Sequence, residues 1–144
     1  VTAAQGGGIQ YRGWRNGGNY TTTFADYASS SFSAGDIHQV AIDVDNQDFY
    51  YGIANVYQAA DAGKDGNPSS GSNPLVADFA FLTNDVVLLA GNYSGTQHWN
   101  FGQNGTFNGT KTAQGNSDGN GIGNFYYAVP TGFLALCSSN LGKV

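Results

Sequence analysis

Short apolar and aromatic runs, separated by glycine, asparagine, aspartate and serine, recur along the whole chain. Several of these runs alternate apolar with polar residues, which is the period of a β-strand with one buried face. We predict about eight strands, near residues 9–15, 20–24, 37–44, 49–51, 86–90, 96–101, 125–127 and 133–136. No segment shows the spacing of an amphipathic helix. The pattern predicts an all-β fold, an antiparallel two-sheet sandwich or jelly roll with few or no helices.

The clearest predicted hairpin lies between residues 37 and 51. On its first strand we expect one face to be buried, and that face carries His38, Val40, Ile42 and Val44. The sequence Asp45-Asn46-Gln47-Asp48 predicts a turn, and Phe49-Tyr50-Tyr51 follows it. Because so short a link permits only an antiparallel neighbour, we expect 49–51 to run back beside 37–44.

The chain has 144 residues, which is the length of one ordinary domain. Residues 59–74 read AADAGKDGNPSSGSNP and are rich in glycine, proline and serine, which predicts a long surface loop. The parts on either side would be small for two well-made domains. We therefore predict a single domain over residues 1–144, with 59–74 as a loop within it.

Composition and charge narrow the class of protein. Hydrophobic residues make up 40% of the chain and aromatic residues 14%, more than a disordered chain carries. Five basic residues against ten acidic ones give a net charge of −5, so nucleic acid is not an expected partner. No apolar run is long enough to predict membrane insertion. The chain contains no methionine, even at position 1, which indicates a removed start or a piece of a longer polypeptide.

Residues 101–141 read FGQNGTFNGTKTAQGNSDGNGIGNFYYAVPTGFLALCSSNL. This segment resembles the carboxyl-terminal part of the SPRY domains of tailed-bacteriophage structural proteins, which end with an aromatic pair, a proline-glycine turn and a phrase similar to GF-ALC--NL. Upstream, Gly35-Asp36 and the following VAIDVD resemble the phrase GD-I-VA-D-D of the same family. The resemblance covers roughly residues 11–141. It departs from the family at His38, at Gln39 and at residues 53–55, where the family usually has an aliphatic residue, a glycine and a Lys-Asn-Gly turn.

The resemblance implies a bent two-sheet sandwich whose edge loops bind a partner, usually without catalysis. A complete SPRY domain has strands before the equivalent of Tyr11, so we expect that Val1 lies inside a longer chain or that neighbouring chains supply those strands. The expected function is that of a phage virion structural protein, in a tail fibre, tail tip or capsid surface, which binds other virion proteins or a host surface glycan or protein. We expect a homo-oligomer on the virion surface. The alternative is a carbohydrate-binding lectin or a polysaccharide-active enzyme on a similar sandwich.

Two aromatic and two basic side chains gather near the amino end. Tyr11, Arg12, Trp14 and Arg15 combine flat apolar faces with guanidinium groups, a composition enriched where proteins bind proteins. We take these four as candidate ligand-binding residues. Trp and Tyr faces also stack on sugars. The alternative, which stays open here, is that Trp14 and Trp99 are core residues.

Metal and cofactor chemistry has weaker candidates, and we predict no cofactor. The D-x-D-N-x-D sequence of residues 43–48 superficially suggests a calcium loop, but it lacks the glycine and glutamate of an EF-hand. A hairpin turn is the preferred interpretation, as it is for 61–67 and for Asp118-Gly119-Asn120-Gly121. His38 and His98 have no ligand partner at a recognised metal spacing.

Catalysis is not expected. No Ser lies in a G-x-S-x-G sequence, and no base is placed beside Cys137, which we interpret as a small buried hydrophobe. A glycosidase would need one protonated and one ionised carboxylate. The ten aspartates lie mostly in Gly/Asn turns, where water keeps their pKa values ordinary.

Overall fold

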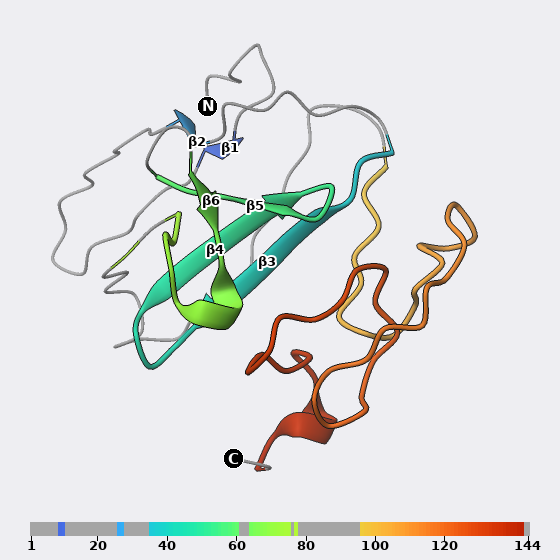
Figure 1. Ribbon diagram of the computed structural model, residues 1–144. Helices are drawn as coiled ribbons and strands as arrows, with labels where there is room; N and C mark the ends of the chain where they lie inside the picture. The colour runs from blue at the N-terminus through green and yellow to red at the C-terminus, as the bar shows by residue number, and fades with distance from the viewer. Residues whose placement is uncertain are drawn as a thin grey trace, which may run out of the picture. The chain divides into compact units, whose positions relative to one another are not determined.

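The computed structural model describes residues 9–10, 26–27, 35–60, 64–75, 77 and 96–142. The chain divides into two compact units, Val1–Leu89 and Ala90–Val144, and each is described by itself (Figure 1). Strands are the main regular structure, and the described residues contain no α-helix. The expected β-rich fold with antiparallel pairing is therefore confirmed, while the two-sheet sandwich and the single domain stay predictions. Within the same residues no helix is long and apolar enough to cross a membrane.

The first unit is built on an antiparallel sheet of four strands in chain order (Figure 1). These strands are β3 (His38–Asp43), β4 (Asp48–Ile53), β5 (Val56–Gln58) and β6 (Asp65–Gly66). A separate pair, β1 (Ile9–Gln10) and β2 (Asp26–Tyr27), is also antiparallel. β1 falls within the strand predicted for residues 9–15. The predicted strands at 20–24 and 86–90 lie outside the described residues.

The β3–β4 hairpin forms as the sequence predicts. Asp43 pairs with Asp48, and residues 44–47 make the turn between them. The Asp43 carboxylate caps this turn, because one oxygen accepts the Asn46 backbone N–H at 3.0 Å and the other accepts the Asn46 side-chain N–H at 2.8 Å. These bonds, the backbone one above all, lower the pKa of Asp43. The preferred interpretation of this segment as a capped turn is confirmed.

The core of the first unit is centred on β4. Tyr50, Tyr51 and Ile53 are buried, and Leu75 packs with the latter two while its N–H donates to the Phe49 carbonyl at 3.0 Å. β4 lies between β3 and β5, so neighbours flank it on both sides. Burial of each such side chain contributes about 1.5–3 kcal/mol.

The expected burial of one face of β3 is wrong. His38, Val40 and Val44 are exposed, whereas Ala41 on the opposite face is buried. Val40 pairs with Tyr51 of β4 across the sheet. On the face that these two residues share, the buried side chain is the one from β4. The alternation of apolar residues on β3 indicates which side chains share a face. It does not indicate which of the two paired strands lies in the middle of the sheet.

The β4–β5 turn brings Asn55 into contact with Gln39 of β3. Ala54 and Asn55 both have positive φ, 50° and 69°, as a two-residue hairpin turn of the primed kind requires. The side-chain oxygen of Gln39 accepts the Asn55 N–H at 2.9 Å. Gln39 lies opposite Gly52, where an added Cβ would meet the Gln39 oxygen at 3.2 Å. Gln39 is therefore in direct contact with both the turn and strand β4.

We expect the substitution Ala54→Gly to stabilise the first unit by about 0.5–1 kcal/mol, because alanine is strained at positive φ and glycine is not. Chemical denaturation followed by circular dichroism would measure the change. Ala60→Gly is the matched control, since Ala60 is exposed and has no positive φ. It should be neutral or destabilising, and equal stabilisation by both variants would contradict the strain argument.

The segment predicted as a loop, 59–74, contains regular structure in the part that is described, residues 59–60 and 64–74. Asp65–Gly66 forms strand β6 against β5, and a 3-10 helix, η1, spans Pro68–Ser70. The Asn67 side chain caps η1 by accepting the Ser70 N–H at 3.3 Å. Most of the described loop is exposed, but Pro68 is buried. Asn67 and Gly71 thus cap the amino and carboxyl ends of η1.

The second unit, described over residues 96–142, folds with turns in place of strand ladders (Figure 1). Its regular elements are the 3-10 helix η2 (Ser138–Asn140) and one antiparallel bridge between Asn116 and Phe125. The strands predicted at 96–101, 125–127 and 133–136 do not form, because side chains bond much of this backbone. Asn116, for example, donates its side-chain N–H to the Tyr126 carbonyl at 2.9 Å. Leu136, expected to close the core, is 73% exposed.

Candidate binding site

The candidate residues near the amino end, Tyr11, Arg12, Trp14 and Arg15, lie outside the described residues. The site with the most defined geometry lies instead in the second unit, on the segment 99–104. Two amide side chains hold this segment and leave two aromatic rings at the surface.

Asn100 fastens the segment from within. Its side-chain oxygen accepts the N–H groups of Gly102 and Asn104 at 2.8 and 3.1 Å. Its side-chain N–H donates to the Asn124 carbonyl at 2.9 Å, and the Asn124 N–H donates back to the Gly102 carbonyl at 2.8 Å. The segment is therefore tied to Asn124 by two hydrogen bonds that run in opposite directions.

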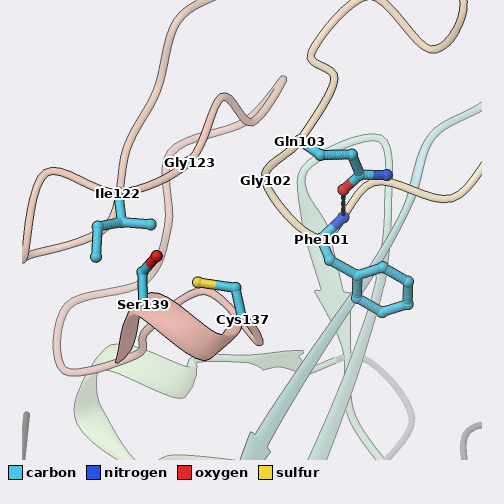
Figure 2. A pocket seen from close by; sticks show the side chains of 7 residues that line it. All are labelled: Phe101, Gly102, Gln103, Ile122, Gly123, Cys137 and Ser139. Carbon is cyan, nitrogen blue, oxygen red and sulfur yellow. Dashed lines mark hydrogen bonds between the residues drawn. The ribbon is translucent and has the colours of Figure 1, made fainter. Parts of the chain in front are cut away.

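Gln103 closes a second loop around the same backbone. Its oxygen accepts the Phe101 N–H at 2.6 Å (Figure 2). Its amide N–H donates to the Trp99 carbonyl at 2.7 Å. These bonds fix the backbone on both sides of Asn100. A segment held this way loses little conformational entropy when a ligand contacts it.

Trp99 and Phe101 form an exposed aromatic stack. Their ring centroids are 6.0 Å apart and their planes differ by 13°. Trp99 is 44% exposed and Phe101 38%, so the interpretation of Trp99 as a core residue is wrong. Because neighbouring apolar side chains left at the surface commonly mark contact sites, this stack is the strongest recognition feature among the described residues.

A pocket of about 350 Å³ opens beside Phe101 (Figure 2). Its size falls within the roughly 300–1,000 Å³ of clefts that hold small ligands. The wall consists of apolar side chains and of polar side chains that carry no charge. Its residues are Phe101, Gly102, Gln103, Ile122, Gly123, Cys137 and Ser139.

Glycine is needed where the two walls of this pocket approach each other. At Gly102 an added Cβ would come within 3.0 Å of the Gly123 Cα, and at Gly123 it would come within 2.4 Å of the Phe125 ring. Both residues have φ near +100°, which L side chains rarely adopt. The absence of side chains at these positions thus permits the close packing behind the pocket.

A buried aspartate organises the other side of the second unit. One oxygen of Asp118 accepts the backbone N–H groups of Asn120 and Ile122, each at 2.9 Å. The other accepts the Ala135 N–H at 2.9 Å and the Asn140 side-chain N–H at 2.8 Å. Asn140 also donates to the Ala135 carbonyl at 2.8 Å and accepts from the Asn120 side chain at 2.9 Å. The turn interpretation of residues 118–121 is confirmed, and the turn is joined to the carboxyl-terminal segment.

These donors lower the pKa of Asp118 from 3.8 to about 2. The Ala135 N–H makes the largest contribution, and the Ile122, Asn140 and Asn120 donors add to it, whereas burial opposes the shift. Asp118 is therefore an anion at neutral pH that serves as an acceptor for the fold. With each oxygen accepting two bonds, its role in the structure is that of a turn cap.

We expect the second unit to lose stability in acid. Because the folded-state pKa of Asp118 lies below the unfolded value, the carboxylate stabilises the fold fully above about pH 4, and this stabilisation is lost as the pH falls through about 2. Denaturant titrations at pH 7, 4, 3 and 2, followed by tryptophan fluorescence, would measure it. The variant Asp118→Asn should show a flatter dependence over this window. An equal acid response in both proteins would contradict the assignment.

The remaining predicted residues have local roles. The His38 ring nitrogen is hydrogen-bonded to the Tyr51 hydroxyl, and burial lowers the pKa of His38 although Asp36 opposes this. His98 is exposed. Cys137 is half-buried at the start of η2, not in a strand, and its Sγ accepts from the Asn140 side chain at 3.8 Å. Within the described residues, no three His, Cys, Asp or Glu side chains are grouped as a metal site would require.

Sequence reasoning missed the roles of Asn100, Gln103 and Asn140. Asn100 and Gln103 flank an aromatic residue in a Gly- and Asn-rich segment, which resembles any other turn. Asn140 lies in the phrase LCSSNL, and the resemblance of that phrase to SPRY domains was the available signal that it matters. Comparison of the whole chain with protein-family models, with curated proteins and with solved structures finds no match.

Proposed function

We propose that this chain is a non-catalytic interaction module of a phage virion structural protein, displayed on a tail fibre, tail tip or capsid surface. It contacts another virion protein or the host surface, and it works as a homo-oligomer. The observation that carries the proposal is the exposure of large apolar side chains on the second unit.

Five large apolar side chains are exposed among the described residues of this unit. They are Trp99, Phe101, Leu134, Leu136 and Leu141. Isolated exposed leucines are ordinary on a protein surface, but aromatic residues such as Trp and Phe are enriched at protein interfaces. A module that presents such groups in repeated copies binds strongly even when each contact is weak.

The resemblance to SPRY domains supports the virion part of the proposal. The phrase that carries it includes Ala135 and Asn140, which bond to each other and to Asp118 in this chain. Their mutual bonds explain why these residue types occur together as a structural unit. They also indicate that the shared phrase serves the fold and that recognition lies elsewhere, on the exposed side chains.

The two aspartates whose pKa values are lowered support a non-catalytic role. A glycosidase needs a carboxyl group whose pKa is raised so that it can donate a proton. Asp43 and Asp118 have lowered pKa values because hydrogen bonds stabilise their anions. Neither has the property of a general acid. The alternative of a lectin is favoured over that of an enzyme by the exposed aromatic stack.

Antibody-gold labelling of intact particles, with serum raised against this 144-residue chain, tests the proposal. We expect labelled particles, and the position of the label separates the two kinds of partner. Label at the tail tip or fibres indicates contact with the host surface, whereas label over the head indicates contact with virion proteins. Particles without label, in a preparation where the serum detects the chain elsewhere, would contradict a role in the virion.

A further inference from the structure

We propose that the Trp99–Phe101 stack and the adjoining pocket bind a pyranose ring of a neutral glycan. This inference rests on the proposed function and names the ligand class of its recognition surface. We call these residues, Trp99, Phe101, Gln103 and Ser139, the sugar site.

The aromatic rings supply the apolar half of the recognition. Trp99 and Phe101 are nearly parallel, so each has one ring face toward the other and one directed away from it. The face of an aromatic ring carries partial negative charge and attracts the partly positive C–H groups that line one side of a pyranose. The Gln103 side chain bonds the backbone of both Trp99 and Phe101. These bonds hold the backbone that carries the two rings before a ligand arrives.

Gln103 and Ser139 supply the polar half. The Gln103 amide uses one N–H for the Trp99 carbonyl and one lone pair for the Phe101 N–H. An amide has two N–H donors and two lone pairs, so in the described structure a second donor and a second acceptor position remain on Gln103. The Ser139 hydroxyl lies in the same pocket wall (Figure 2). Sugar hydroxyls both donate and accept, and these groups match them.

The charge of the site favours a neutral ligand. Among the described residues, no Asp, Glu, Lys or Arg side chain lines the pocket, so they offer no charged side chain to a phosphate, a carboxylate or an ammonium group. The chain carries a net charge of −5, which disfavours the approach of acidic polysaccharides. A pyranose ring has an apolar face and carries uncharged hydroxyl groups. Both features are complementary to the apolar and uncharged polar side chains of this pocket wall.

Affinity electrophoresis through gels that contain dextran, soluble starch, galactomannan or xyloglucan tests the ligand class. We expect the full chain to be retarded by at least one of these polysaccharides. Trp99→Ala should weaken the retardation by about tenfold or more, whereas Trp99→Phe should retain part of it because a ring face remains. Leu141→Ala is the control: Leu141 is 77% exposed and apolar but does not line the pocket, and its removal should leave retardation unchanged.

Two results would overturn the sugar site. One is the absence of retardation in all four gels. The other is retardation that Trp99→Ala leaves unchanged, or that Leu141→Ala reduces equally. Thermal melts of each variant separate lost binding from lost folding.

The Gln103→Glu variant should also weaken binding. It keeps the size of the side chain but removes its N–H groups.

A second measurement separates this inference from the proposed function. Particles labelled by the antibody, together with a chain that no polysaccharide retards, would leave the virion role intact and refute the glycan. Retardation that depends on Trp99, together with unlabelled particles, would support the glycan and refute the virion role.

Discussion

Replacement of Asp118 by alanine is expected to lower the melting temperature of the second unit by roughly 10 °C or more. The substitution removes the acceptor of four hydrogen bonds, from Asn120, Ile122, Ala135 and Asn140. Buried donors that lose their acceptor incur a desolvation cost that a small side chain such as alanine does not offset. Over residues 96–142 no strand ladder holds these segments together, so the loss should spread through residues 116–142. Calorimetry or a fluorescence melt at pH 7 would measure it.

Two variants make the result specific. Asp45→Ala removes an exposed aspartate from a hairpin turn in the other unit and should leave the melting temperature nearly unchanged. Asp118→Asn retains one acceptor oxygen but places an amide N–H group against two donors, and its effect should be intermediate. A melting temperature for Asp118→Ala equal to that of Asp45→Ala would contradict the role assigned to the buried carboxylate.

The second large effect is expected from Gly123→Ala, which should destabilise the second unit by about 2–4 kcal/mol. Two costs add at this position. The residue has φ of 100°, which strains an L side chain, and the new Cβ would lie 2.4 Å from the ring of Phe125. The backbone of Phe125 is held by two hydrogen bonds with Asn116, at 2.7 and 3.2 Å, so relief of the contact requires rotation of the Phe125 ring. Urea denaturation followed by tryptophan fluorescence would measure the change.

Gly121→Ala separates the two costs. Gly121 also has positive φ, at 74°, but an added Cβ there would meet no atom within 4 Å. It should therefore cost only the conformational strain, about 1 kcal/mol. If Gly121→Ala and Gly123→Ala prove equally destabilising, then contact with Phe125 contributes nothing and the close approach behind the pocket is less tight than the structure indicates.

The first unit shows how far local pattern extends. Residues 37–51 were predicted as a hairpin from alternation and from an aspartate-rich turn, and β3 and β4 pair in that way. These signals are local, because turn residues and strand period act over a few neighbours. The buried side of β3 was predicted wrongly because burial depends on which strand lies in the middle of the sheet, and that is a property of the assembled sheet.

The second unit shows where local pattern fails. Residues 125–127 and 133–136 are aromatic or aliphatic, and strand propensity favoured them, but Asn116 and Asp118 bond backbone groups there that a ladder would otherwise use. Asp118 and Ala135 are 17 residues apart, and no pattern in the sequence between them predicts their contact. Side-chain bonds over such a distance compete with strand pairing only once the chain has folded.

The sequence by itself determined that this chain is rich in strands and turns, that residues 37–51 form an antiparallel hairpin, and that the aspartates at 43 and 118 cap turns. These features follow from the steric and hydrogen-bonding preferences of neighbouring residues. Only the tertiary structure decided that Trp99 and Phe101 lie exposed and stacked beside a pocket, and that Asp118 joins residues distant in the chain. Exposure and long-range bonding depend on what the rest of the chain covers, so no pattern within a short window fixes them.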